Sequence, residues 1–168
     1  MTQLAANDLD RSLPKNGFVR QVLTLRPPRI AIGLLLAAWL VATAFSDWRI
    51  EWIGIGIEAA AAAVIGLSIM MLAWLEFHRH ENPVCHTAQP ILMVGTGPFR
   101  YSRNPMYLGI FIALCAPFLG SGSLVFLGPP IIFFAIINWV VVPYEERKMR
   151  TSFGDDYIGY AQRVRRWI

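Results

Sequence analysis

Arg103, Asn104 and Pro105 stand in a row where a basic, turn-rich loop meets a long apolar segment. Proline at the first position of a helix sacrifices no hydrogen bond, and an Asn side chain can accept from the free N–H groups of the first turn. We therefore expect a helix to open at Asn104. Its N–H groups and dipole favour an anion, which the guanidinium of Arg103 could bind in bidentate fashion. The alternative is a well-capped membrane helix with Tyr101 and Tyr107 in the interface.

Two adjacent acids, Glu145 and Glu146, follow a run from Asn104 to Tyr144 that contains no Asp, Glu, Lys or Arg. We expect this run to end in a helix that closes at the two acids. Carboxylates at the C-terminus of a helix oppose its dipole, so a cationic partner would remove a local cost. The acid pair is therefore a second candidate for binding, this time of a cation.

Two polar residues inside apolar segments are candidates for contacting a substrate. Asn138 lies seven residues before Glu145, about two helical turns, and therefore near the same face. It could bind a polar group of a substrate, or it could be a buried Asn that joins two helices. Glu58 lies within the apolar run 53–75, where a carboxylate is costly enough to suggest a function, although snorkelling to the interface is equally open.

Two other patterns carry less chemistry. The polar loop 78–86 contains three His and one Cys, but their spacing matches no closed zinc site, so we predict no metal. Gly95-Thr96-Gly97 lacks the third glycine of a dinucleotide fingerprint, and no strand pattern precedes it. A Rossmann domain is therefore excluded.

The composition places these candidates in a membrane protein, since the 168 residues are 55% hydrophobic with a mean hydropathy of +0.46. We expect an all-α integral membrane protein with about four transmembrane helices, the last two forming a helical hairpin. An amphipathic interfacial tail follows. The expected helices cover residues 30–45, 53–75, 105–119 and 129–146. Residues 1–29 are predicted to be a cytoplasmic segment without a cleavable signal peptide, and residues 30–168 one membrane domain.

The basic residues predict the orientation. Of the 15 Lys and Arg residues, 14 fall before the first expected helix, between the second and third, or after the fourth. By the positive-inside rule, both termini and the loop that carries Arg103 face the cytoplasm, in a bacterial inner membrane. The net charge of +4 is thus explained by topology, and we predict no nucleic-acid partner. Cys85 and Cys115 are expected to be free thiols.

Two ordered blocks of residues resemble a known family. The first block is Gly-Pro-Phe-Arg-Tyr-Ser-Arg-Asn-Pro-Met-Tyr-Leu-Gly, from Gly97 to Gly109. The second block comprises Glu145, Glu146, Phe153, Gly154, Tyr157, Tyr160 and Val164. Together they resemble the integral-membrane methyltransferases related to isoprenylcysteine carboxyl methyltransferase and phospholipid N-methyltransferase, with Asn104 where many members have histidine. The resemblance covers residues 91–168.

This resemblance implies S-adenosylmethionine as the cofactor. The cofactor contacts that it implies, within the expected cofactor-binding part 91–168, are Leu92, Met93, Val94, Gly97, Phe99, Arg103, Asn104, Pro105, Met106, Tyr107, Glu145 and Glu146. Among them, Arg103 and Glu145 are the candidate catalytic residues. Methyl transfer is an in-line displacement, so the main task of such a protein is to hold the reacting groups collinear in a water-poor cavity.

The acceptor is expected to be a lipophilic molecule that enters from the bilayer: a lipid amine, a thiol or an isoprenyl-cysteine-like carboxylate. Carboxyl-methylating relatives carry an arginine where this chain has Val141, which argues against the carboxylate. Two readings from other classes stay open, namely a non-catalytic membrane interaction protein and a sterol-reductase-like oxidoreductase that shares the C-terminal site architecture.

Overall fold

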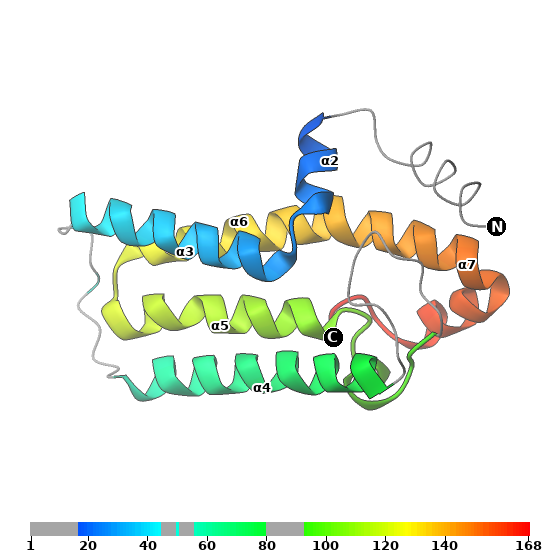
Figure 1. Cartoon of the computed structure of the whole chain (residues 1–168). Coiled ribbons are helices and arrows are strands. Elements are labelled where there is room, and N and C mark those ends of the chain that lie inside the picture. Colours follow the sequence, from blue (N-terminus) through cyan, green and yellow to red (C-terminus); the bar gives the residue numbers. More distant parts are fainter. Residues whose placement is uncertain (1–16, 45–49, 51–55, 80–92) are drawn as a thin grey trace.

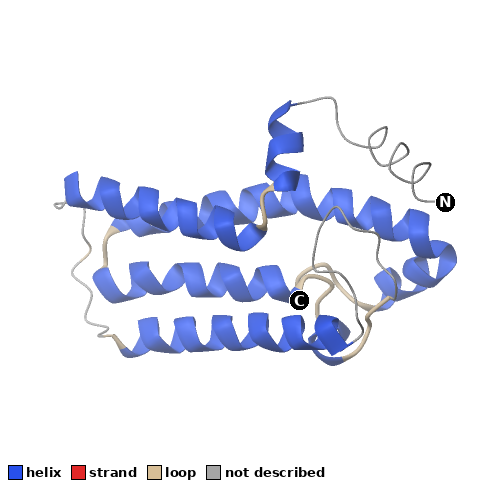
Figure 2. Cartoon of the chain, in the orientation of Figure 1, coloured by secondary structure: helices blue, strands red, loops and turns tan. Residues whose placement is uncertain are grey.

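The computed structural model describes residues 17–44, 50, 56–79 and 93–168. Within these ranges the chain is helical and contains no strand (Figure 2). Three helices are long and apolar enough to cross a membrane: Pro27–Ala44, Ile57–Arg79 and Leu124–Arg163. The apolar helix Pro105–Ser121 is shorter. The prediction of an all-α membrane protein with about four spans is therefore confirmed.

Each long helix runs antiparallel to the next one along the chain (Figure 1). The elements are α2 (Gly17–Thr24), α3 (Pro27–Ala44), α4 (Ile57–Arg79), η1 (Gly97–Arg100), α5 (Pro105–Ser121), η2 (Leu124–Leu127), α6 (Gly128–Ile136), η3 (Ile137–Val141) and α7 (Val142–Arg163). Apolar side chains on their outer faces are exposed, among them Leu36, Trp39 and Leu40 on α3. Such faces fit contact with lipid tails.

α4 and α5 pack unusually closely, because glycines meet across their interface. A Cβ atom added at Gly66 would lie 2.5 Å from both the Gly109 oxygen and the Ala113 nitrogen. One added at Gly120 would lie 3.1 Å from the Cβ of Ala59, the first residue of the alanine stretch. Small residues let the backbones of membrane helices approach in this way. Ala59 therefore adds a further small residue to this close contact between α4 and α5.

The second arm of the hairpin is longer than predicted. α6, the π-helical segment η3 and α7 follow one another without a break, and helix continues from Gly128 to Gly154, whose φ of +52° interrupts it. The predicted end at Glu146 is wrong, since leaving the membrane ends the apolar composition of a helix but not its hydrogen bonding. Glu145 consequently lies in the first turn of α7 and Glu146 directly after it, so the argument from an opposed dipole at a helix C-terminus does not apply.

Arg103 and the acids Glu145 and Glu146 lie toward one end of the bundle. The start of α3, the loop before α5, the end of α7 and the C-terminal residue lie at this end (Figure 1). The turn between α5 and α6 lies at the other end, where the Ile50 amide donates to the Gly122 carbonyl at 3.0 Å. This arrangement agrees with the division of basic residues. Which end faces the cytoplasm stays a prediction.

Candidate functional site

The loop before α5, residues 93–104, is called the arginine loop below. Its first half is fixed to α4 by apolar packing. Val94 and Phe99 are buried against Ala73, with Phe77 and Met106 beside them. Val94, Phe99 and Met106 were predicted to contact the cofactor, and in the structure their side chains form this small core.

Gly97 occupies a position that needs glycine. Its φ is +55°, and an added Cβ atom would lie 3.1 Å from the carboxyl carbon of Glu76. The neighbouring Thr96 hydroxyl donates to Glu76, which also pairs with Arg79 at 3.6 Å. The loop therefore crosses the end of α4 at close range, in a backbone conformation that a side chain at position 97 would strain.

Asn104 precedes α5 as predicted, but its side chain does not cap the helix. Its amide nitrogen instead donates to the Arg166 carbonyl at 2.9 Å, and its backbone N–H donates to the Ser102 hydroxyl at 3.1 Å. The predicted capping bond is wrong, because a carbonyl from a distant part of the chain competes for the side chain. Pro105 begins the helix and needs no cap for its own nitrogen.

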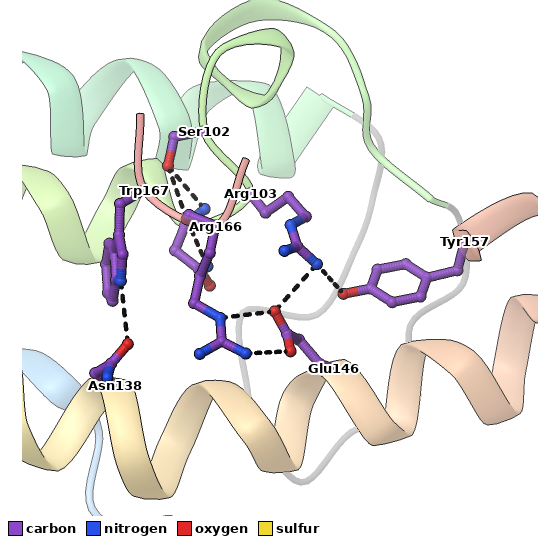
Figure 3. Close-up of polar contacts among 8 residues, drawn as sticks. Ser102, Arg103, Asn138, Glu146, Tyr157, Arg166 and Trp167 are labelled. Atoms are coloured by element: carbon purple, nitrogen blue, oxygen red, sulfur yellow. Dashed lines mark hydrogen bonds and ion pairs between the residues drawn. The ribbon is translucent and has the colours of Figure 1, made fainter. Parts of the chain in front are cut away.

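Arg103 meets Glu146 where the arginine loop faces α7 (Figure 3). Its Nη1 lies 3.1 Å from Glu146 Oε1, and the two side chains are only 15% and 12% exposed. The same Nη1 donates to the Tyr157 hydroxyl at 3.3 Å. Arg166 binds Glu146 from the other side in bidentate fashion, with its Nε 3.0 Å from Oε1 and its Nη2 2.7 Å from Oε2. One carboxylate is therefore shared between two guanidinium groups.

This cluster keeps a net charge of +1, since it holds two guanidinium groups and one carboxylate. The hydrogen bond to Glu146 raises the pKa of Arg166 above its ordinary value. Arg103 Nε is buried and has no hydrogen-bond partner among the residues that the structure describes. A buried donor without a partner is costly, so an acceptor from outside the chain would stabilise it.

A pocket of about 380 Å³ opens beside this cluster. It is lined by Arg103, Arg150, Ile158, Ala161 and Gln162. Its volume lies within the roughly 300–1,000 Å³ that small-molecule sites occupy. Two arginines and an amide give it donors for an anionic group, and Ile158 and Ala161 give it apolar surface. The pocket can therefore hold part of a ligand that carries both.

Glu145 has a different partner from Glu146. The Tyr107 hydroxyl, on α5, donates to Glu145 Oε1 at 2.7 Å. Tyr107 is buried, and its position two residues into the helix after Pro105 brings this bond to the same end of the bundle as Arg103. The structure thus brings the candidates Arg103, Glu145, Glu146 and Tyr107 together.

The two residues predicted to bind the substrate lie far from each other. Asn138 is in the π-helical segment, and its side-chain oxygen accepts from the Trp167 indole nitrogen at 3.1 Å, so that oxygen already has a partner (Figure 3). Glu58 is exposed in the first turn of α4, at the far end of the bundle from Arg103 (Figure 1). Leu92 lies outside the described residues. These assignments of role stay predictions.

The metal and thiol predictions fall only partly on described residues. His78 stacks on Trp74 with ring centroids 5.1 Å apart, whereas residues 80–86 lie outside the described ranges. Within those ranges, no three His, Cys, Asp or Glu side chains are grouped so that they could hold a metal ion. Cys115 is a free thiol, as predicted, and Cys85 is not described.

Sequence reasoning missed the residues that follow α7. Residues 164–168, called the strap below, are not helical and lie against the arginine loop. Arg166 and Trp167 were read as part of an interfacial tail, yet Arg166 pairs with Glu146 and Trp167 packs against the bundle core. The acid pair, for which a cationic partner was expected, was the signal that could have pointed to Arg166.

Comparisons with known proteins give the family. Residues 64–156, more than half of the chain, match the phospholipid methyltransferase family. An uncharacterized protein of Haemophilus influenzae is 44% identical over 64 residues, which are 38% of this chain and all of that protein. Methanethiol S-methyltransferase 1 of Bradyrhizobium diazoefficiens is 36% identical over 67 residues, 39% of this chain and 22% of that enzyme.

Protein-S-isoprenylcysteine O-methyltransferase B of Arabidopsis thaliana is 36% identical over 78 residues, 43% of this chain. The matched part is 36% of that enzyme's length, so this chain aligns with a minor part of either named methyltransferase. No solved structure matches the chain significantly. Because the family match covers both the acid pair and the arginine loop, the chain belongs to the phospholipid methyltransferase family of membrane proteins.

Proposed function

We propose that this protein is a membrane methyltransferase that uses S-adenosylmethionine and transfers its methyl group to a lipophilic acceptor. The observation that carries the proposal is the buried, unpartnered Nε of Arg103 within a cluster of net positive charge, beside a pocket of about 380 Å³. The cofactor has a carboxylate that would satisfy such a donor. Family membership adds the class of reaction.

The chemical groups of the cofactor match the side chains at this end of the bundle. Arg103 would hold the carboxylate, with Arg150 lining the same pocket. Glu145, held by Tyr107, would attract the positive charge of the ammonium or sulfonium group. When bound, S-adenosylmethionine supplies an electrophilic methyl group on a positively charged sulfur.

The contribution of the chain is to position groups and exclude water. Tyr107 on α5 and Glu145 on α7 are joined by their hydrogen bond, and Arg103 is held by Glu146 and Tyr157. A site built on rigid elements in this way lowers the entropic cost of aligning an acceptor with the methyl group. No covalent intermediate on the protein is required.

The acceptor is proposed to be lipophilic and to enter from the bilayer. The helices α3 and α4 expose apolar side chains along most of their lengths, as helices in contact with lipid do. Val141, where carboxyl-methylating relatives are expected to carry arginine, is buried and apolar. An acceptor with an amine or a thiol fits this position better than one with a carboxylate. Transfer to a thiol is also the activity in the name of the Bradyrhizobium relative.

Calorimetric titration of the detergent-solubilised protein with S-adenosylmethionine tests the cofactor. We expect binding by wild type and a large loss of affinity in Arg103→Ala and Glu145→Gln. Arg100→Ala and Asp155→Asn are matched controls, because both side chains are exposed, and they should bind as wild type does. Undiminished binding in both site variants would refute the site. Stabilisation by a reduced nicotinamide nucleotide instead would favour an oxidoreductase.

Transfer to the acceptor is tested with methyl-labelled cofactor and a native membrane extract. We expect label to partition into the organic phase with wild type but not with Arg103→Ala. Label found only in water-soluble products would contradict a lipophilic acceptor. Base-labile label in the organic phase would show that the acceptor is a carboxylate after all.

A further inference from the structure

The strap, residues 164–168, is tied to the arginine loop by its backbone. The Arg103 amide donates to the Arg165 carbonyl at 2.9 Å. The Arg166 carbonyl accepts from the Ser102 hydroxyl at 3.2 Å and from the Asn104 side-chain amide at 2.9 Å. Three consecutive residues of the arginine loop therefore depend on the strap for hydrogen-bond acceptors. Figure 3 shows Ser102 beside Arg166.

Trp167 anchors the strap in the bundle. Its indole nitrogen donates to Asn138 Oδ1, and its ring centroid lies 5.1 Å from that of Phe134. Asn138 belongs to η3, the single π-helical segment in the described part of the chain. An extra residue in a helical turn changes the direction in which side chains point, and such segments are frequent at functional sites.

Arg166 then fixes the position of Glu146. Its bidentate bond engages Glu146 Oε2 and shares Oε1 with Arg103. Without Arg166, both oxygens of Glu146 would be free for Arg103, and a bidentate pair between these two would be the favoured geometry. Arg103 would then be turned toward Glu146 and away from any ligand.

We propose that Arg166 is a positioning residue for the cofactor site, which acts through Glu146 on the orientation of Arg103. The strap holds Arg166 in place from both sides, through the arginine loop and through Trp167. This inference rests on the proposed function, since it gives Arg103 a ligand to bind. Arg166 itself is not placed in contact with the cofactor.

The first test compares the affinity for S-adenosylmethionine of Arg166→Gln and Arg165→Gln. The same substitution is made one residue apart, and the Arg165 side chain is exposed. We expect Arg166→Gln to bind about tenfold more weakly, by analogy with the lower end of what the loss of a residue that supports a metal ligand costs, and Arg165→Gln to bind normally. The double variant Glu146→Gln/Arg166→Gln should have the same affinity as whichever single variant binds more weakly, because both substitutions act on Arg103.

The second test does not depend on the cofactor. In protein labelled with ¹⁵N-arginine, the Nε–Hε resonance of Arg103 reports its orientation. We expect it to shift in Arg166→Gln but not in Arg165→Gln. Arg166→Lys, which keeps the charge but cannot bind a carboxylate in bidentate fashion, should shift it as well and is the variant to use if Arg166→Gln does not fold.

The two tests separate the possible failures. If wild type does not bind S-adenosylmethionine, the proposed function is wrong, and the Arg103 resonance alone decides whether Arg166 positions Arg103. If wild type binds but the Arg166 and Arg165 variants bind equally well with unchanged Arg103 resonances, the positioning role is refuted. Weaker binding in Arg166→Gln with an unchanged Arg103 resonance also refutes it, because Arg166 would then act by another route.

Discussion

Replacing Gly109 by alanine should force α4 and α5 apart. The added Cβ atom would lie 2.5 Å from the Gly66 oxygen and 2.7 Å from the Met70 nitrogen, and both are backbone atoms that cannot rotate away. Overpacking of this kind costs about 1–3 kcal/mol. Gly33→Ala in α3 is the matched control, since nothing lies within 4 Å of its added Cβ atom.

Both substitutions put alanine into a helix, so the gain in helix propensity, up to about 1 kcal/mol, cancels in the comparison. The difference between their free energies of unfolding then isolates the packing cost of about 1–3 kcal/mol. For a chain of this length, each kcal/mol corresponds to roughly 2–4 °C in the unfolding temperature. Thermal unfolding in detergent micelles measures this difference directly.

The packing also reaches the site, because Tyr107 is two residues before Gly109 on α5 and donates to Glu145 on the facing helix. Gly109→Ala should therefore weaken cofactor binding, whereas Gly33→Ala should not. Gly66→Ala combined with Gly109→Ala should cost less than the sum of the two, since helices parted for one methyl group leave room for the other. Equal unfolding temperatures for Gly109→Ala and Gly33→Ala would refute the close helix contact.

Three further outcomes are expected. Asn104→Asp should destabilise the protein by about 1 kcal/mol or more, because the amide nitrogen that donates to the Arg166 carbonyl is lost, whereas a helix cap would tolerate Asp; chemical unfolding distinguishes the two. Tyr107→Phe should cost about 1–3 kcal/mol through the lost 2.7 Å bond to Glu145, and Tyr101→Phe, whose ring is exposed, close to nothing in the same assay. Reporter fusions after Gly17, Pro83 and Ile168 should give a cytoplasmic signal, and fusions after Ser46 and Ser121 should give a periplasmic signal. A periplasmic signal after Pro83 or Ile168 would overturn this topology.

The number and order of the helices could be predicted from the sequence, because a membrane helix needs a continuous apolar run. The first expected helix, 30–45, corresponds to α3, and Pro27 begins it three residues earlier. The expected helix 53–75 corresponds to α4, which starts at Ile57 and extends to Arg79. Helix ends were predicted from where charge begins, and that rule fails wherever a helix continues into water.

The roles of the two acids could not be predicted, although both were named as candidates. Adjacent residues on a helix point about 100° apart, so Glu145 and Glu146 had to face different partners. Which of them meets Arg103 depends on the rotation of α7, and the π-helical segment just before it changes that rotation by adding a residue to one turn. Glu145 faces Tyr107 on α5, and Glu146 faces the two arginines.

Arg166 was hidden for a related reason. Six basic residues follow α6, and each is a cation near aromatic residues in the sequence. This pattern is the same for a residue on an exposed tail and for one, such as Arg166, that pairs with a largely buried acid. Only the return of the chain after Gly154 brings Arg166 back over Glu146, 20 residues earlier in the chain. Because this return also supplies the carbonyl that draws Asn104 away from capping α5, one turn of the chain accounts for both the missed pair and the wrong cap.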